Sequence, residues 1–208
     1  MLNVANLQKK LVAAFWKWFK AFRREVENAY SSGDTSWLDS ELTNRVRAIE
    51  PNLNWEIGPY FDPEFTLVIS PSIRQNIGLA KAIIHTAPQI AGWHFLAAKP
   101  PKRMTRLVAE LPFRSDAEIC GDEWCYRLTS YNNGEFFDIE IFTDVPSSIQ
   151  KDDLFMLTHR LIEALVGEIV YLERIGAVTV YRPTDSRSLE NTTSLRFLHE
   201  HLTGLIGE

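Results

Sequence analysis

Cysteine is scarce in this chain of 208 residues, in which Cys120 and Cys125 are the only two. Two cysteines are too few for the disulfide framework that stabilises small secreted proteins. No second pair is available to complete a structural zinc site, so no metal site is expected. The count favours two free, partly buried thiols in a reducing cytoplasm, with a regulatory disulfide or half of a metal site as the alternatives.

Long apolar runs and an excess of positive charge are also missing. No stretch of about 18–20 apolar residues is present, so the sequence predicts no transmembrane helix. Lys9, Lys10, Lys17 and Lys20 interrupt the start of the chain, which is unlike a secretory signal. The net charge of −5 gives no general attraction for nucleic acid. These features predict a cytoplasmic protein without a nucleic-acid partner.

The motifs of the commonest enzyme classes are absent as well. Gly58, Gly78 and Gly92 are isolated, so no glycine-rich phosphate loop follows a strand. No Gly-x-Ser-x-Gly nucleophile motif occurs. His199 and His201 would diverge by about 200° around a helix, so one helix cannot present both to a single metal ion. No cofactor is therefore expected, although an unfamiliar enzyme class stays open.

The clearest positive signal lies between Trp124 and Asp144, where Asn133-Gly134 separates two β-rich segments. This dipeptide is typical of a two-residue hairpin loop, because both of its positions need positive φ. Pairing outward from Asn132 and Glu135 gives an apolar face and a charge-matched face. The apolar pairs are Leu128–Ile139, Tyr126–Ile141, Ser130–Phe137 and Trp124–Thr143, and the other pairs are Arg127–Glu140, Thr129–Asp138 and Cys125–Phe142.

Residues 3–30 predict a long amphipathic helix, with apolar residues at three- and four-residue spacing and basic residues opposite them. The helix can pack on its own domain with its lysines in water. It can also contact a second copy or a partner, or lie on an anionic membrane surface. The residues that would form such an interaction site are Trp16, Lys17, Trp18, Phe19, Lys20, Arg23 and Arg24. A second helix is predicted up to residue 49.

The order strand, strand, helix, strand occurs twice, over residues 54–99 and 124–181. It predicts an α+β domain spanning residues 51–208, built from two ββαβ units that share a mainly antiparallel six-stranded sheet with helices on one face. Residues 1–50 would form a separate N-terminal helical segment, and residues 194–206 a C-terminal helix. Residues 115–122 are polar and are predicted to form a loop.

Short motifs in the first of these units resemble a group of uncharacterised bacterial proteins. They are Trp-Glu-Ile-Gly-Pro at residues 55–59, then Ala-Pro at 87–88, Gly-Trp at 92–93 and Lys-Pro at 99–100. The likeness extends over about residues 53–181 and leaves out the basic N-terminal helix. The resemblance implies a bacterial cytoplasmic protein and assigns no activity.

Four polar residues are candidates for acid–base or metal chemistry. Asp138 and Glu140 lie two apart on one strand face, and two such carboxylates can divide acid and base roles or bind a cation. Glu56 and His94 would meet as an acid–base pair if their strands were neighbours. Plain ion pairing, such as Arg127 with Glu140, is the competing interpretation.

These observations favour a non-catalytic cytoplasmic protein that binds another protein, or a second copy of itself, through the polar sheet face or the N-terminal helix. An immunity-type or regulatory role fits that interpretation. The alternatives are a hydrolase-like or metal-dependent enzyme that uses the four polar candidates, and a peripheral membrane protein attached through residues 3–30.

Overall fold

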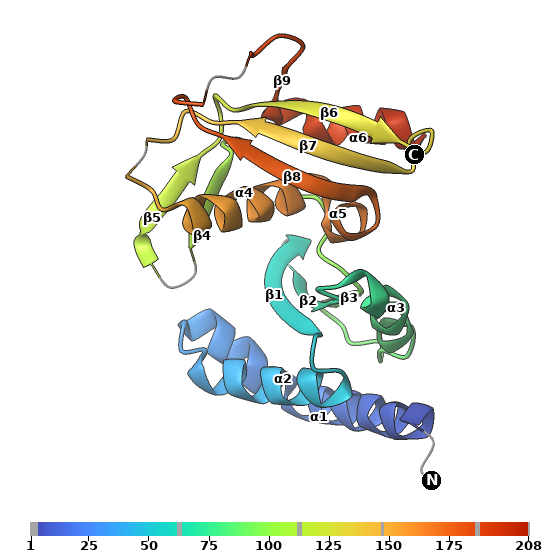
Figure 1. Ribbon diagram of the computed structural model, residues 1–208. Coiled ribbons are helices and arrows are strands. Elements are labelled where there is room, and N and C mark those ends of the chain that lie inside the picture. The colour runs from blue at the N-terminus through green and yellow to red at the C-terminus, as the bar shows by residue number, and fades with distance from the viewer. Residues whose placement is uncertain (1–3, 62–63, 112–113, 147, 186–187, 208) are drawn as a thin grey trace. The chain divides into compact units, whose positions relative to one another are not determined.

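A computed structural model describes residues 4–61, 64–111, 114–146, 148–185 and 188–207 (Figure 1). The chain forms two compact units, Met1–Lys99 and Pro100–Glu208. The sequence predicted a division after residue 50 instead. The boundary lies further along because the two N-terminal helices share a hydrophobic core with the strands that follow them.

The first unit contains three helices and a three-stranded sheet. Its elements are α1 (Val4–Ser32), α2 (Ser36–Ile49), β1 (Asn54–Phe61), β2 (Glu64–Ser70), a short 3-10 turn η1 (Arg74–Asn76), α3 (Ile77–His85) and β3 (Trp93–Leu96). The strand order is β1-β2-β3. Strands β1 and β2 are antiparallel, whereas β3 returns through α3 to lie parallel to β2.

The core of the first unit forms between one face of this sheet and the helices. Phe15 and Phe19 of α1 are almost fully buried and pack with Leu67 of β2 and Trp93 of β3. The N–H group of a buried indole needs a hydrogen-bond acceptor, and two tryptophans of this core have one. The Trp93 indole donates to Glu27 at 2.7 Å, which fixes β3 to α1.

The second unit begins with a two-stranded hairpin and continues into a four-stranded sheet. Its elements are β4 (Val108–Leu111), β5 (Arg114–Cys120), β6 (Cys125–Tyr131), β7 (Phe136–Phe142), α4 (Lys151–Val166), α5 (Glu168–Arg174), β8 (Ile175–Tyr181), β9 (Thr193–Ser194), a 3-10 turn η2 (Leu195–Phe197) and α6 (Leu198–Ile206). The larger sheet has the order β8-β7-β6-β9. Helices α4 and α6 cover its apolar face, where Tyr126, Phe137, Ile139 and Ile141 are buried.

The hairpin register predicted for residues 125–142 is confirmed at every pair from Cys125–Phe142 to Ser130–Phe137. The loop is longer than predicted, because Tyr131 and Phe136 form the last pair and residues 132–135 turn the chain. Asn132, Asn133 and Gly134 all have positive φ, of 50°, 57° and 92°. Asparagine and glycine tolerate this conformation, which explains why three of them occur in succession. Strand β6 begins at Cys125, so the predicted pair of Trp124 with Thr143 falls outside the strand and is not among its pairs.

The prediction of a single six-stranded sheet is wrong, because the structure contains sheets of three, two and four strands instead. The repeated order itself is present: each unit has an antiparallel hairpin followed by a helical crossover to a parallel strand. Each apolar sheet face is covered by its own helices, so two separate cores form. The polar segment 115–122 is also not a loop, since β5 runs to Cys120 and pairs with β4.

Candidate binding surface

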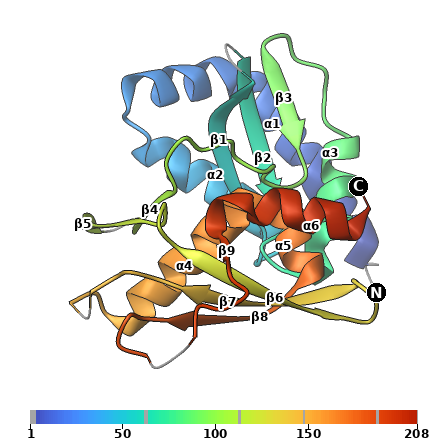
Figure 2. The ribbon, with the colours of Figure 1, turned by 90° about the horizontal axis from the view of Figure 1, so that it is seen from above.

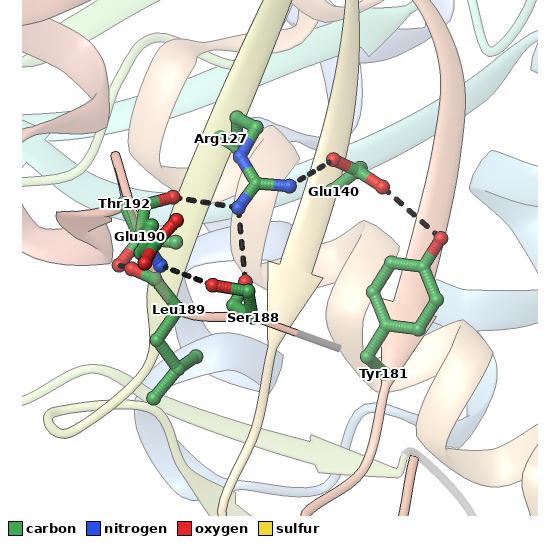
Figure 3. Close-up of polar contacts among 7 residues, drawn as sticks. All are labelled: Arg127, Glu140, Tyr181, Ser188, Leu189, Glu190 and Thr192. Carbon is green, nitrogen blue, oxygen red and sulfur yellow. Dashed lines mark hydrogen bonds and ion pairs between the residues drawn. The ribbon is translucent and has the colours of Figure 1, made fainter. Parts of the chain in front are cut away.

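Three neighbouring strands of the second unit bring a polar network together on the face of the sheet that points away from α4 and α6 (Figure 3). Arg127 of β6 donates to Glu140 of β7 at 2.9 Å. The hydroxyl of Tyr181 on β8 donates to the other oxygen of Glu140 at 3.0 Å. The side chains of Arg127 and Glu140 are 28% and 25% exposed, so the pair is only partly screened by water.

The same guanidinium holds the segment between β8 and β9 against the sheet. Its second terminal nitrogen donates to the carbonyl of Ser188 at 3.0 Å and to that of Glu190 at 2.7 Å (Figure 3). Within this segment the Thr192 hydroxyl donates to the Leu189 carbonyl at 2.7 Å. Arg127 therefore connects three parts of the unit through charge-assisted hydrogen bonds.

The predicted carboxylate pair of Asp138 and Glu140 is engaged in structural contacts. Both Glu140 oxygens accept hydrogen bonds from Arg127 and Tyr181. Asp138 accepts from the backbone N–H of Ala177 at 2.7 Å, at the irregularity in β7–β8 pairing. The hydrogen bonds of both carboxylates thus order β8 beside β7, as the ion-pairing interpretation expects.

Glu56 and His94 lie in the first unit, on β1 and β3, with β2 between them. The Tyr60 hydroxyl donates to Glu56 at 2.8 Å. The His94 ring contacts the carboxylate of Glu64, and it lies 4.6 Å from the ring of Phe61. The predicted Glu56–His94 pair required neighbouring strands, and the strand order β1-β2-β3 does not meet that condition. Over the described ranges, no group of three or more His, Cys, Asp or Glu residues is arranged to hold a metal ion.

The residues proposed as an interaction site on the N-terminal helix divide into two sets. Trp16, Trp18 and Phe19 are 5%, 7% and 0% exposed, and they pack in the core of their own unit. Lys17, Lys20 and Arg24 are exposed, and Arg23 is half-buried. The aromatic residues thus pack on their own domain and not on a second copy, a partner or a membrane surface.

The outer edge of β8 was not predicted from the sequence. This strand ends the four-stranded sheet and pairs with β7 on one side (Figure 2). Backbone groups alternate between the two sides of a strand, and the Tyr181 carbonyl accepts from Thr143 on the β7 side at 2.9 Å. Val178 and Val180 therefore direct their N–H and C=O groups toward the open side. These groups form a template on which another strand can pair.

The composition of β8 is unusual for an edge strand. Its seven residues, Ile-Gly-Ala-Val-Thr-Val-Tyr, include no charge and no proline. Proteins normally protect edges with charged residues, proline, irregular register or short length. Strand β1 has Glu56, Pro59 and a register shift, β3 has four residues, β9 has two, and β5 carries several charges. Strand β8 has one such protection, an irregular register at its start, between the pairs Phe137–Ile175 and Ile139–Val178. Among the strands that the structure describes, residues 178–181 of β8 are thus a regularly paired edge segment with neither charge nor proline.

A groove of about 800 Å³ runs along this edge. One side is formed by residues 178–182 of β8 and the chain just after it, and the other by the first turns of α4 through Lys151, Leu154 and Phe155. Phe155 is 50% exposed, although it is a large apolar side chain. The groove therefore offers an apolar wall beside the outward-facing backbone of β8, and its charged lining residues are Lys151, Arg182 and Asp185. The run of uncharged β-formers at 175–181 was the one sequence signal for this site.

Comparison with protein-family models, with curated proteins and with solved structures finds no match. No helix in the described ranges has both the length and the apolar character needed to cross a bilayer.

Proposed function

We propose that this chain is a non-catalytic binding protein, and that its second unit takes up an extended segment of another protein as an additional strand along β8. The observation that carries this proposal is the uncharged, proline-free edge of Ile175–Tyr181. Strand addition is an established mode of peptide recognition, in which backbone hydrogen bonds supply affinity and side-chain pockets supply specificity. The groove beside β8 supplies such a pocket.

A partner segment fits this edge better than a second copy of β8 does. A second β8 would bring the small side chains of Val178 and Val180 to the groove, which at about 800 Å³ has room for more. Larger apolar side chains of a partner would contact Phe155 and Leu154. An acidic residue would lie near Lys151 at the rim. We therefore expect bound segments to alternate large apolar residues with polar ones, with at least one carboxylate.

The polar network supports this use of β8, because it holds the strand in place against β7. Tyr181 is bound to Glu140, and Glu140 to Arg127, so the far end of β8 is ordered before any partner arrives. A preorganised edge lowers the entropy cost of binding. This is the role that we assign to the carboxylates that the sequence offered as catalytic candidates.

The test uses the full chain in a selection from random peptides displayed on phage. Selected peptides are synthesised, and their affinities are measured for the wild type and for Val180→Pro. The substitution removes an N–H on the open side of β8, so it blocks an added strand and leaves the β7 pairing intact. We expect binding to weaken by about tenfold or more. Thermal unfolding of each variant confirms that it is folded.

A second variant pair examines the groove without touching the strand. Phe155→Ser removes the exposed aromatic of the groove, and Phe197→Ser removes an equally exposed one outside it, the two being 50% and 49% exposed. We expect only the first to weaken binding. In NMR spectra the amides of Val178 and Val180 should exchange more slowly when peptide is bound. Equal affinity of the selected peptides for the wild type, Val180→Pro and Phe155→Ser contradicts the proposal, as does a selection that yields no binder.

We further propose that this binding takes place in the cytoplasm and serves a regulatory or immunity-type role. The low cysteine count and the resemblance of residues 53–181 to bacterial proteins support this location. Affinity for the product of a neighbouring gene, measured with the purified pair, tests the role.

A further inference from the structure

We infer that a second groove binds a small organic phosphate, and this inference does not depend on the proposed function. The groove is made by the chain that precedes β4, by Leu165 of α4, by Arg196 of η2 and by the first turn of α6. The groove has a volume of about 590 Å³, which is within the range of small-molecule sites. All of its lining residues belong to the second unit. Lys102 is fixed beside α4, because its backbone N–H donates to the Ala164 carbonyl at 2.7 Å.

The rim of this groove is basic in a chain whose net charge is −5. Lys102, Arg103 and Arg196 contribute permanent positive charges, and His199 adds a fourth nitrogen-bearing side chain. Glu200 is the one carboxylate in the lining. Positive charge concentrated in a concave site attracts and orients anions more effectively than the same charges spread over a surface.

One of these cations is held by a contact outside the groove. Arg196 lies 3.4 Å from Asp122, which also accepts the backbone N–H of Leu107 at 2.9 Å. The N–H of Leu107 is the principal cause of the lowered pKa of Asp122, and a hydrogen bond from Cys120 is the next. A carboxylate kept charged in this way orients the guanidinium and leaves its other donors for a ligand. Arginine presents several donors in a plane, which suits the oxygens of a phosphate.

The floor of the groove is apolar. Met104, Leu107, Leu165 and Pro101 line it, and Leu107 is 2% exposed. Inorganic phosphate would use the rim alone, whereas a phosphate ester with an apolar or aromatic body would use the rim and the floor together. The geometry therefore points to an organic phosphate, with its anionic group among the cations and its apolar body over Met104 and Leu165.

The experiment is an NMR titration of the ¹⁵N-labelled full chain with phenyl phosphate, inorganic phosphate, benzoate and benzyl alcohol. We expect phenyl phosphate to bind most tightly, with saturable shifts confined to residues 102–107 and 195–200. The double substitution Arg103→Gln and Arg196→Gln should weaken phenyl phosphate by about tenfold or more, since two charge-assisted contacts are lost. Raising the salt concentration from low to moderate should weaken it as well.

Arg160→Gln is the matched control, because Arg160 is an exposed arginine of the same unit and does not line the groove. Equal weakening by the control and by the double substitution would show a general charge effect and overturn the inference. Inorganic phosphate or benzyl alcohol binding as tightly as phenyl phosphate overturns the ligand class, and so does the absence of saturable shifts. Thermal unfolding of the variants separates lost binding from lost folding.

Discussion

Replacing Arg127 with methionine tests the central network of the second unit most directly. The substitution keeps most of the side-chain stem, which covers the sheet, and removes the guanidinium. Three hydrogen bonds are lost, to Glu140 and to the carbonyls of Ser188 and Glu190. The π contact with Phe142, whose ring centre lies 5.2 Å from the guanidinium carbon, is lost with them.

The magnitude follows from the exposure of the groups. Hydrogen bonds to a charged group contribute about 1.5–3 kcal/mol each when well buried. The side chains of Arg127 and Glu140 are 28% and 25% exposed, and the two carbonyls belong to exposed residues, so water replaces part of each bond. Glu140 also keeps the hydroxyl of Tyr181. We therefore expect Arg127→Met to lower the free energy of unfolding by about 2–3 kcal/mol in total.

Urea denaturation measures this change, provided that the slope with denaturant is the same for wild type and variant. Arg127→Lys is the control, because it keeps the charge but cannot serve three acceptors in one plane; we expect about half of the loss. Hydrogen exchange at the amides of Glu190 and Thr192 should become faster in Arg127→Met, while exchange in the middle of α4 should not.

A double-mutant cycle with Glu140→Gln isolates the ion pair. Because the two side chains are in direct contact, we expect a coupling energy of about 1 kcal/mol. The assignment of Arg127 as the connection between the sheet and the segment before β9 would be refuted by two results together. The free energy of unfolding of Arg127→Met would lie within about 0.5 kcal/mol of the wild type, and hydrogen exchange at Glu190 and Thr192 would be unchanged.

Three further predictions concern the core of the second unit and its titratable groups. Gly167→Ala should destabilise the protein by about 2–3 kcal/mol in urea denaturation, because φ is +82° and a Cβ would lie 2.8 Å from a proline ring carbon; Gly204→Ala, where a Cβ meets nothing within 4 Å, should not. Burial lowers the pKa of His159, so as the pH falls below about 6.5 the unfolded chain takes up a proton before the folded protein does. Below that pH, the stability of the wild type should therefore decrease more than that of His159→Gln. Burial raises the pKa of Tyr126 and of Tyr171 to about 12, so a spectrophotometric titration should leave both protonated at pH 11, and stability should decrease as the pH rises above about 10; full ionisation of every tyrosine by pH 11 in the folded protein contradicts this.

Local sequence patterns predicted the individual elements of this protein well. The Asn-Gly step and the alternation of apolar residues on both sides of it gave the β6–β7 register, because a shift by one residue would expose the apolar set. The second ββαβ unit was predicted to end with a strand at residue 181, and β8 ends at Tyr181. Helices α1, α2 and α6 lie close to the ranges predicted from three- and four-residue spacing, whereas α5 was not predicted. These signals are contained within a few residues of chain or within one hairpin, so the sequence alone determined them.

Tertiary structure decided how the elements are grouped and which polar residues meet. Nothing local distinguishes one sheet of six strands from several smaller sheets, because the choice depends on which helices cover which apolar face. The partner of His94 is Glu64 and not Glu56, because β2 lies between β1 and β3. The open edge of β8 follows from the same cause, since a strand becomes an edge through the position of its neighbours and not through its own residues.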